Sequence, residues 1–109
     1  MSYSEVLADE IRTHIGDHPG LTEREMFGGI AFMVNGNMAV GVNGEDLIVR
    51  VGKEAHEEAI SRLGARVFDL PARPMPGWIA VSPEGLAADV DLDSWIRQGV
   101  AYAESLPPK

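Results

Sequence analysis

Two Asn-Gly dipeptides, at 35–36 and 43–44, interrupt a long apolar stretch that carries almost no charge. Asn-Gly is the pair that best supplies the positive φ angles of a tight hairpin turn. The apolar segments beside these turns predict three antiparallel strands in a meander, at about 26–34, 37–42 and 47–51. A meander of this kind fixes which residues face each other across the strands.

Both faces of the predicted meander are apolar. With two-residue turns, one face holds Met33 opposite Met38 and Ala31 opposite Val40, with Leu47 and Val49, and we expect helices to cover it. The other face receives Ile30, Phe32, Val34, Ala39, Gly41 and Ile48, joined by Arg50. A second apolar face indicates a further layer, a partner chain or a ligand surface. We therefore predict a homodimer with an interface at Ile30, Phe32, Val34 and Ile48.

The rest of the chain predicts three helices and two further strands. Apolar residues at helical spacing indicate helices at about 2–18, 53–63 and 91–106. Short strands are expected at 66–68 and 78–81, with the proline-rich segment between them as an irregular loop. The order α-β-β-β-α-β-β-α predicts a two-layer α+β sandwich, in which helices cover one face of a mostly antiparallel five-stranded sheet. The 109 residues are expected to form one domain, 1–109.

Charge and hydropathy narrow the classes of partner. The chain has 17 acidic and 9 basic residues and a formal net charge of −8, which opposes direct binding to nucleic acid or to anionic membranes. It contains no segment approaching the ~20 apolar residues of a membrane span and no signal-peptide pattern at its start. We therefore expect a cytoplasmic protein without a membrane partner.

Sequence patterns for catalysis or metal binding are weak. His14 and His18 are four residues apart, as two metal ligands on one helical face would be, but no third ligand is indicated. Gly28 and Gly29 enter a strand rather than a helix, so a bulge or a close backbone approach is favoured over a phosphate-binding loop. No nucleophile pattern or carboxylate pair stands out. We expect no catalytic residues, no metal and no cofactor.

One group of residues suggests a ligand site. Arg50 projects from an otherwise apolar strand, so it either pairs with a carboxylate such as Asp69 or is open to an anion. Arg73 and Trp78 lie in the proline-rich region, which could shape a small pocket beside an arginine. The candidate ligand-binding residues are therefore Arg50, Lys53, Arg73 and Trp78.

Five segments in order resemble the N-terminal domain of the TfoX competence regulators. They are MFGGIAFMVNG at 26–36, RVG at 50–52, GARVFD at 64–69, MPGWIAVSPEGL at 75–86 and SLPPK at 105–109. The resemblance spans nearly the whole chain and implies a two-layer α+β fold with an antiparallel sheet. Full-length members promote the expression of DNA-uptake genes in naturally competent bacteria, so the resemblance also implies a regulatory setting. Because the chain stops after SLPPK, we expect a stand-alone domain without the C-terminal domain of those regulators.

Two functions from different classes follow from these patterns. The first is a non-catalytic regulatory or protein-interaction module, with a protein partner that the sequence does not identify. The alternative is a small-molecule or anion-binding protein, conceivably an enzyme, with its pocket near Arg50 and Arg73. The state of Arg50, paired or open, distinguishes the two.

Overall fold

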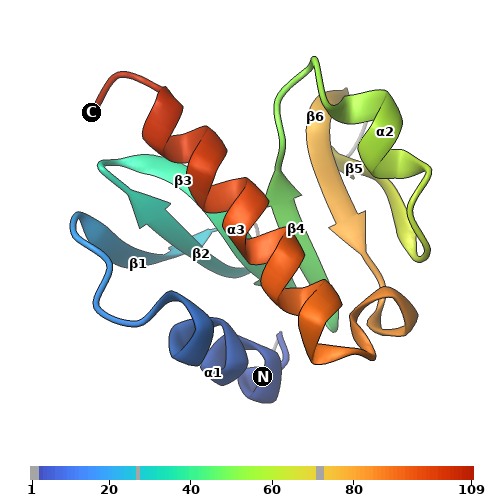
Figure 1. Ribbon diagram of the computed structural model, residues 1–109, viewed down its shortest axis with the longest axis horizontal. Coiled ribbons are helices and arrows are strands. Elements are labelled where there is room, and N and C mark those ends of the chain that lie inside the picture. Colours follow the sequence, from blue (N-terminus) through green and yellow to red (C-terminus); the bar gives the residue numbers. More distant parts are fainter. Residues whose placement is uncertain (1–2, 27, 71–72) are drawn as a thin grey trace.

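The protein folds as helices on one side of a curved antiparallel sheet (Figure 1). The computed structural model describes residues 3–26, 28–70 and 73–109, and for 69, 70 and 73–75 it describes the backbone alone. In chain order the elements are α1 (Glu5–Ile15), β1 (Leu21–Met26), β2 (Gly29–Val34), β3 (Asn37–Asn43), β4 (Asp46–Arg50), α2 (His56–Ile60), β5 (Ala65–Leu70), β6 (Arg73–Val81), the 3-10 helix η1 (Pro83–Leu86) and α3 (Asp89–Ser105). The described strands pair in the order β1-β2-β3-β4-β6-β5, which confirms the predicted α+β class.

The sheet has six described strands rather than the predicted five, because the sequence did not indicate β1. This strand has the polar sequence LTEREM and is mostly exposed, as expected for an edge strand that buries neither face. It pairs antiparallel with β2, with Met26 opposite Gly29. Gly28, at a φ of 76°, therefore lies in a hairpin turn and not before a helix. That position rules out a phosphate-binding loop of the strand-loop-helix kind here.

The turn between β2 and β3 forms as predicted, but the pairing beyond it is shifted. Asn35 and Gly36 have φ angles of 54° and 83°, and Met33 pairs with Met38. Phe32 then pairs with Val40, so β3 carries an extra residue, Ala39, as a β-bulge. Ala31 consequently lies opposite Gly41, and the predicted pairing with Val40 is wrong.

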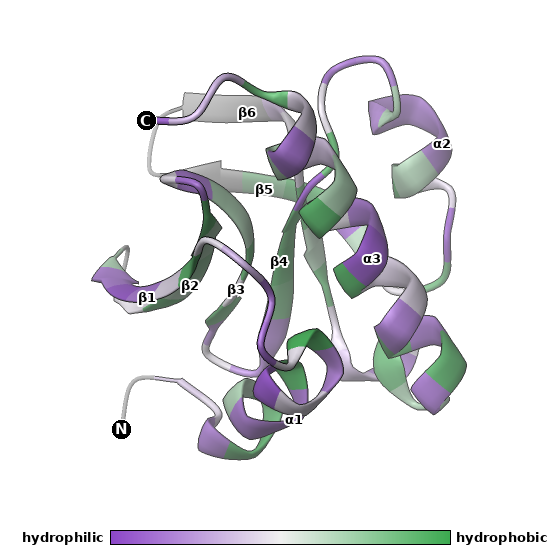
Figure 2. Ribbon diagram, turned by 60° about the vertical axis from the view of Figure 1, so that its left-hand side comes forward, coloured by the Kyte–Doolittle hydropathy of each residue, from purple (hydrophilic) through white to green (hydrophobic). Residues whose placement is uncertain are grey.

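The bulge also changes which side chains face the helices. Ile30 and Phe32 lie in the main core with Val40, Leu47 and Val49, under residues of α1 and α3. Phe32 is fully buried, as is Val34, which packs against Ala39 and Ala103. Figure 2 shows α1 and α3 on the same side of the sheet, and apolar residues of both helices belong to the main core. The sequence-based assignment of the sheet faces is therefore wrong for β2, Met38 and Ala39. It is right for Val40, Leu47 and Val49, which face the helices, and for Ile48, which lies on the opposite face.

The second sheet face is closed within the same chain. It holds the buried residues Ala31, Met33, Met38, Ile48 and Ala80. The sheet curves strongly (Figure 2), and Phe68 of β5 and Trp78 of β6 pack against this cluster. The curved sheet therefore covers this face with its own residues, whereas the sequence-based prediction assigned that role to a partner chain.

All four residues of the predicted dimer interface are buried within the chain. Ile30 has 5% of its surface exposed, and Phe32, Val34 and Ile48 have none. Three of these four residues lie under the helices and Ile48 lies on the opposite face. Self-association remains a prediction, which these four residues no longer support.

Residues 69–70 and 73–77 of the proline-rich segment lie in strands rather than in an irregular loop. Strands β5 and β6 pair up to Leu70 and Arg73, with Asp69 opposite Pro74. Strand β4 pairs with β6 only at 78–81, so among the described residues 73–76 of β6 have no strand partner on that side. A proline is tolerated on such an edge because no partner there requires its missing N–H.

The helices are shorter or shifted relative to the sequence-based ranges. Ser4 caps α1 by accepting a hydrogen bond from the Leu7 backbone N–H at 3.1 Å.

Helix α3 approaches the sheet very closely at Gly99, where a Cβ atom would lie 2.4 Å from the Ala39 carbonyl oxygen. No described helix has the length and apolar character needed to cross a membrane.

Candidate functional site

The fold brings together two of the residues predicted to bind a ligand. Arg50 is the last residue of β4 and pairs directly with Trp78 of β6. The Arg50 Cζ atom lies 4.9 Å from the centroid of the Trp78 ring, within the range of a cation–π contact. Both residues are half-buried.

A second aromatic ring contacts the same guanidinium group. Tyr102 of α3 has its ring centroid 5.5 Å from the Arg50 Cζ atom. The ring rests on Gly52, where a Cβ atom would lie 2.4 Å from a Tyr102 ring carbon. We call Arg50, Trp78 and Tyr102 the Arg50 cluster.

The backbone beneath the Arg50 cluster is held by several hydrogen bonds. The Gly77 carbonyl oxygen accepts from the backbone N–H groups of Val51 and Gly52 at 2.8 and 3.2 Å. The Gly77 N–H donates to His56 Nδ1 at 2.9 Å. Gly52 and Gly77 both have positive φ, and a Cβ atom on Gly77 would lie 2.7 Å from the Gly52 carbonyl carbon. Only glycine meets both requirements at Gly77.

An open hollow of about 540 Å³ lies beside the cluster. Its lining residues are Val51, Gly52, Lys53, Glu54, Ala55, Tyr102 and Ser105. Lys53, predicted from the sequence, is therefore at this hollow, together with one carboxylate, Glu54. Arg73 begins β6, but its side chain lies outside the described residues.

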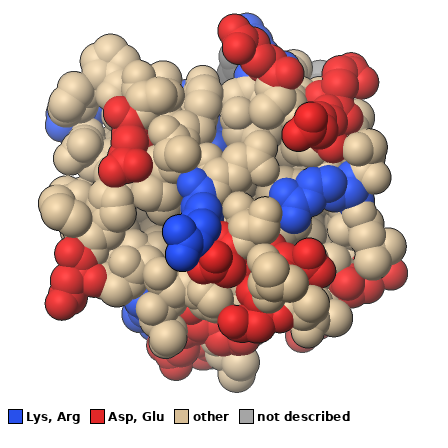
Figure 3. Space-filling model, viewed as in Figure 1, with Lys and Arg blue, Asp and Glu red and all other residues tan. Residues whose placement is uncertain are grey.

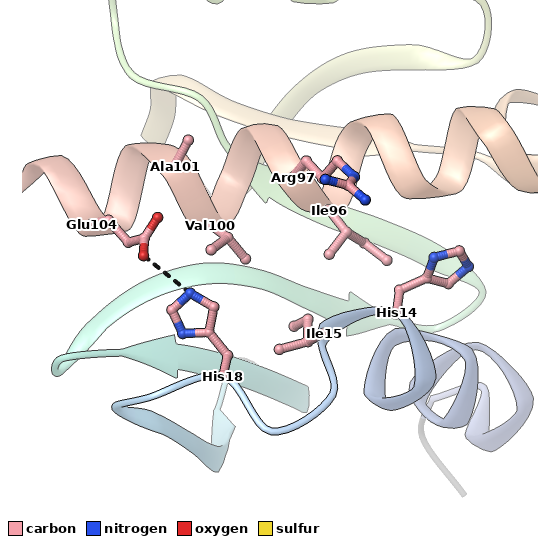
Figure 4. Close-up of a pocket in the computed structure, with 8 residues that line it drawn as sticks. All are labelled: His14, Ile15, His18, Ile96, Arg97, Val100, Ala101 and Glu104. Carbon is pink, nitrogen blue, oxygen red and sulfur yellow. Dashed lines mark hydrogen bonds and ion pairs between the residues drawn. The ribbon is translucent and has the colours of Figure 1, made fainter.

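The two histidines that raised the possibility of a metal site are held apart by other partners. Figure 4 shows His14 and His18 at opposite ends of a hollow of about 330 Å³ between α1 and α3. His18 Nε2 contacts Glu104 at 3.0 Å, and His18 Nδ1 contacts the Pro19 carbonyl oxygen at 2.8 Å. Among the described residues, no group of three or more His, Cys, Asp or Glu side chains is placed to hold a metal ion.

His14 links α1 to the beginning of α3. Its Nδ1 lies 3.0 Å from Asp93 and its Nε2 lies 3.1 Å from Asp89. Burial of the ring lowers the pKa of His14, but hydrogen bonds to Asp93 and Asp89 outweigh burial and raise the pKa above its ordinary value of 6.5. Hydrogen bonds from Arg97 and His14 lower the pKa of Asp93 below its ordinary 3.8.

These contacts give a pH-dependent contribution to stability. Because the folded-state pKa of His14 is raised, its stabilisation is complete below 6.5 and is lost as pH rises through the folded-state value. We expect His14→Gln to lower the melting temperature by a few degrees at about pH 5.5 and to have little effect at about pH 9. Thermal melts of wild type and variant across this range measure the difference. The exposed neighbour Thr13 provides a control, since Thr13→Gln should act equally at every pH; a deficit for His14→Gln that grows with pH would contradict the assignment.

A second surface feature was not indicated by the sequence. Val6, Leu63 and Val90 are each 72% exposed, and they lie around η1. Val6 lines a shallow hollow of about 190 Å³ with Pro83 and Leu86 of η1. We call these five residues the η1 surface. Val6 is not on the buried side of α1, which holds Leu7, Ala8 and Ile11.

Leu63, which lies shortly before β5, forms the other side of the η1 surface. Leu63 lines a smaller hollow of about 60 Å³ with Arg62, Gly85, Asp91 and Trp95. A Cβ atom on Gly85 would lie 2.3 Å from the Leu63 carbonyl oxygen, so η1 sits directly against this segment. Val90 lies in the first turn of α3, the helix that follows η1 in the chain. Val6 and Leu63 therefore lie beside η1, and Val90 lies shortly after it.

Acidic residues surround the η1 surface. Glu10 and Glu45 line its larger hollow, Asp91 lines the smaller one, and Glu84 lies in η1 itself. Arg62 is the basic residue among the described lining residues, and it stacks on the Trp95 ring at 3.7 Å. Figure 3 shows Asp and Glu gathered on the lower part of the molecule, where Figure 1 places α1 and the start of α3.

Two residues near Arg50, Tyr102 of the Arg50 cluster and His56 beneath it, were not predicted from the sequence. Trp95, Gly99 and Tyr102 follow one another at spacings of four and three residues, which is the signal of one helix face. His56 stands among charged residues in the sequence, a pattern that is typical of a solvated surface residue. The hydrogen bond from the Gly77 N–H to His56 joins residues that are 21 positions apart, and no local sequence pattern indicates it.

Comparison with protein families gives a match over most of the chain. The profile of the family described as TfoX N-terminal domain matches residues 13–103. No curated protein and no solved structure gives a significant match. The matched region runs from the last turn of α1 into α3 and contains the whole sheet. The chain therefore belongs to the TfoX N-terminal domain family.

Proposed function

We propose that the protein is a non-catalytic regulatory module that acts by binding a protein partner through the η1 surface. The observation that carries this proposal is the grouping of Val6, Leu63 and Val90, each 72% exposed, around η1. Scattered apolar residues need no explanation, but a group of them around one element is typical of a contact surface. Membership of the TfoX N-terminal domain family supports a regulatory setting.

Charge suggests the chemistry of the partner. Glu10, Glu45, Glu84 and Asp91 lie next to the apolar side chains, and the chain as a whole has a net charge of −8. A partner that presents apolar side chains among Lys or Arg residues would match both features. A second copy of this acidic chain would not.

The proposal is tested by comparing partner capture by matched variants. The test variant combines Val6→Ser, Leu63→Ser and Val90→Ser, and the control variant is Met26→Ser, at an exposed apolar residue on β1. Because all four positions are exposed, we expect both variants to melt within a few degrees of wild type. Each protein is immobilised and exposed to extract from the cells in which it naturally occurs.

We expect one protein to be retained by wild type and by Met26→Ser, and to be lost with the triple variant. Retention should weaken as salt rises, because opposite charges surround the apolar contacts. Equal retention by the triple variant, or no retention by wild type, would contradict the proposal.

A further inference from the structure

We propose that the edge of the Arg50 guanidinium group binds the carboxylate or phosphate group of a small molecule. This site lies at the ends of β4 and β6 and is separate from the η1 surface. The inference rests on the stacking of Arg50, on the neighbouring hollow and on the rigidity of the backbone beneath them.

Two aromatic rings lie next to the Arg50 guanidinium group. The ring centroids of Trp78 and Tyr102 are 4.9 and 5.5 Å from its Cζ atom, within cation–π range. Its N–H groups point outward in the plane of that group, in the fork that matches two oxygens of one oxyanion. Among the side chains that the structure describes, none makes an ion pair or a hydrogen bond with Arg50.

The neighbouring hollow gives room for the body of a ligand. It has a volume of about 540 Å³, and Tyr102 belongs both to its lining and to the Arg50 cluster. Val51 and Ala55 supply apolar contacts, and Lys53 adds a second positive charge. The negative charge of Glu54 offsets the positive charge of Lys53. With Arg50 included, the described charges around the site sum to +1, although the whole chain has a net charge of −8. A single oxyanion group fits this balance better than a multiply charged one.

The site is held in position before any ligand arrives. Gly77 makes hydrogen bonds to His56 and to the backbone of Val51 and Gly52, which fixes the start of the pairing between Arg50 and Trp78. A prearranged site loses less entropy on binding than one that must first become ordered. The segments RVG and MPGW, which carry much of the family resemblance, meet at this point.

The competing structural role is an ion pair between Arg50 and Asp69. Asp69 lies on β5, and its side chain is outside those described. In that arrangement a carboxylate of the chain itself would occupy the edge of the guanidinium group. The variant Asp69→Asn separates this possibility from an open site, because it removes the competing charge and keeps the size of the side chain.

The test is a titration of the ¹⁵N-labelled protein with inorganic phosphate and, separately, with benzoate, at constant ionic strength. We expect at least one of the two to shift the Trp78 indole N–H and the Gly52 amide while leaving the Trp95 indole unchanged. Phosphate alone would indicate a phosphorylated ligand, and benzoate alone a carboxylate with an apolar body. Either result supports the oxyanion site.

Two variants connect the shifts to Arg50. Arg50→Lys retains the charge but loses the planar fork, and we expect about tenfold weaker binding. Arg62→Lys is the matched control, since Arg62 stacks on Trp95 and away from this site, and it should leave the affinity unchanged. The amide spectrum of each variant establishes that it is folded.

Three results would overturn the proposal. The first is no shift of the Trp78 indole with either anion in wild type. The second is unchanged affinity in folded Arg50→Lys. The third is binding that appears only in Asp69→Asn, which would assign Arg50 to a structural ion pair. None of these results bears on the η1 surface, whose variants lie elsewhere in the fold.

Discussion

The variant Phe32→Asp is expected not to fold. Phe32 is fully buried in the main core between the sheet and the helices. Removing a buried Phe side chain costs about 3–5 kcal/mol, and burying an unpaired carboxylate costs several more. A domain of this size has a total stability of roughly 5–15 kcal/mol, so the sum removes most or all of it. Far-UV circular dichroism and amide spectra would show an unfolded chain at 25 °C.

A conservative change at the same position provides the control. Phe32→Leu retains an apolar side chain and should remain folded with a loss of about 1.5 kcal/mol. If Phe32→Asp instead gave a folded monomer with the melting temperature of wild type, the side chain would have to be exposed. That result would restore the sheet-face assignment made from the sequence and would contradict the packing described above.

The variant Gly99→Val is expected to lower the melting temperature by roughly 10–25 °C. A Cβ atom at Gly99 would lie 2.4 Å from the Ala39 carbonyl oxygen and 2.7 Å from a Val40 methyl carbon. Helix α3 would have to move away from β3, and such overpacking costs about 3 kcal/mol. Thermal unfolding followed at 222 nm measures the change.

Ala101 of the same helix is exposed and supplies the comparison. Ala101→Val pays only the lower helix propensity of Val, about 0.5 kcal/mol, and should shift the melting temperature by a few degrees. Equal melting temperatures for the two variants would mean that α3 does not rest on the bulge at Ala39. The close approach of helix and sheet would then be wrong.

Local turn chemistry was the most reliable guide to this fold. Asn35-Gly36 forms the predicted two-residue turn with both φ angles positive, and the pairing of Met33 with Met38 follows from it. One residue further along, the bulge at Ala39 changes the pairing. The bulge lies where α3 approaches β3 at Gly99, a contact between distant segments that no local pattern encodes.

Two larger errors share a cause in tertiary structure. Strand β1 has no apolar alternation because it lies at the sheet edge, so its sequence resembles a polar loop. The second apolar face suggested a partner chain because a flat sheet would have exposed it. Curvature instead lets Phe68 and Trp78 close that face.

The sequence predicted two of the three residues of the Arg50 cluster. Arg50 and Trp78 stood out because each is an unusual residue in its segment, and the sheet register places them opposite each other. Tyr102 joins them from α3, and this contact depends on how the helix crosses the sheet. The η1 surface depends in the same way on packing, because Val6, Leu63 and Val90 lie far apart in the sequence.

The most direct test of the proposed function is amide hydrogen exchange of the protein alone and in complex with the partner retained by wild type. We expect slower exchange on binding at 82–91 and in the first turn of α1, which together carry most of the η1 surface. Exchange along β1, at the far edge of the sheet, should be unchanged. Protection confined to β1, or to the C-terminal half of α3, would place the partner elsewhere and would contradict the assignment of the η1 surface.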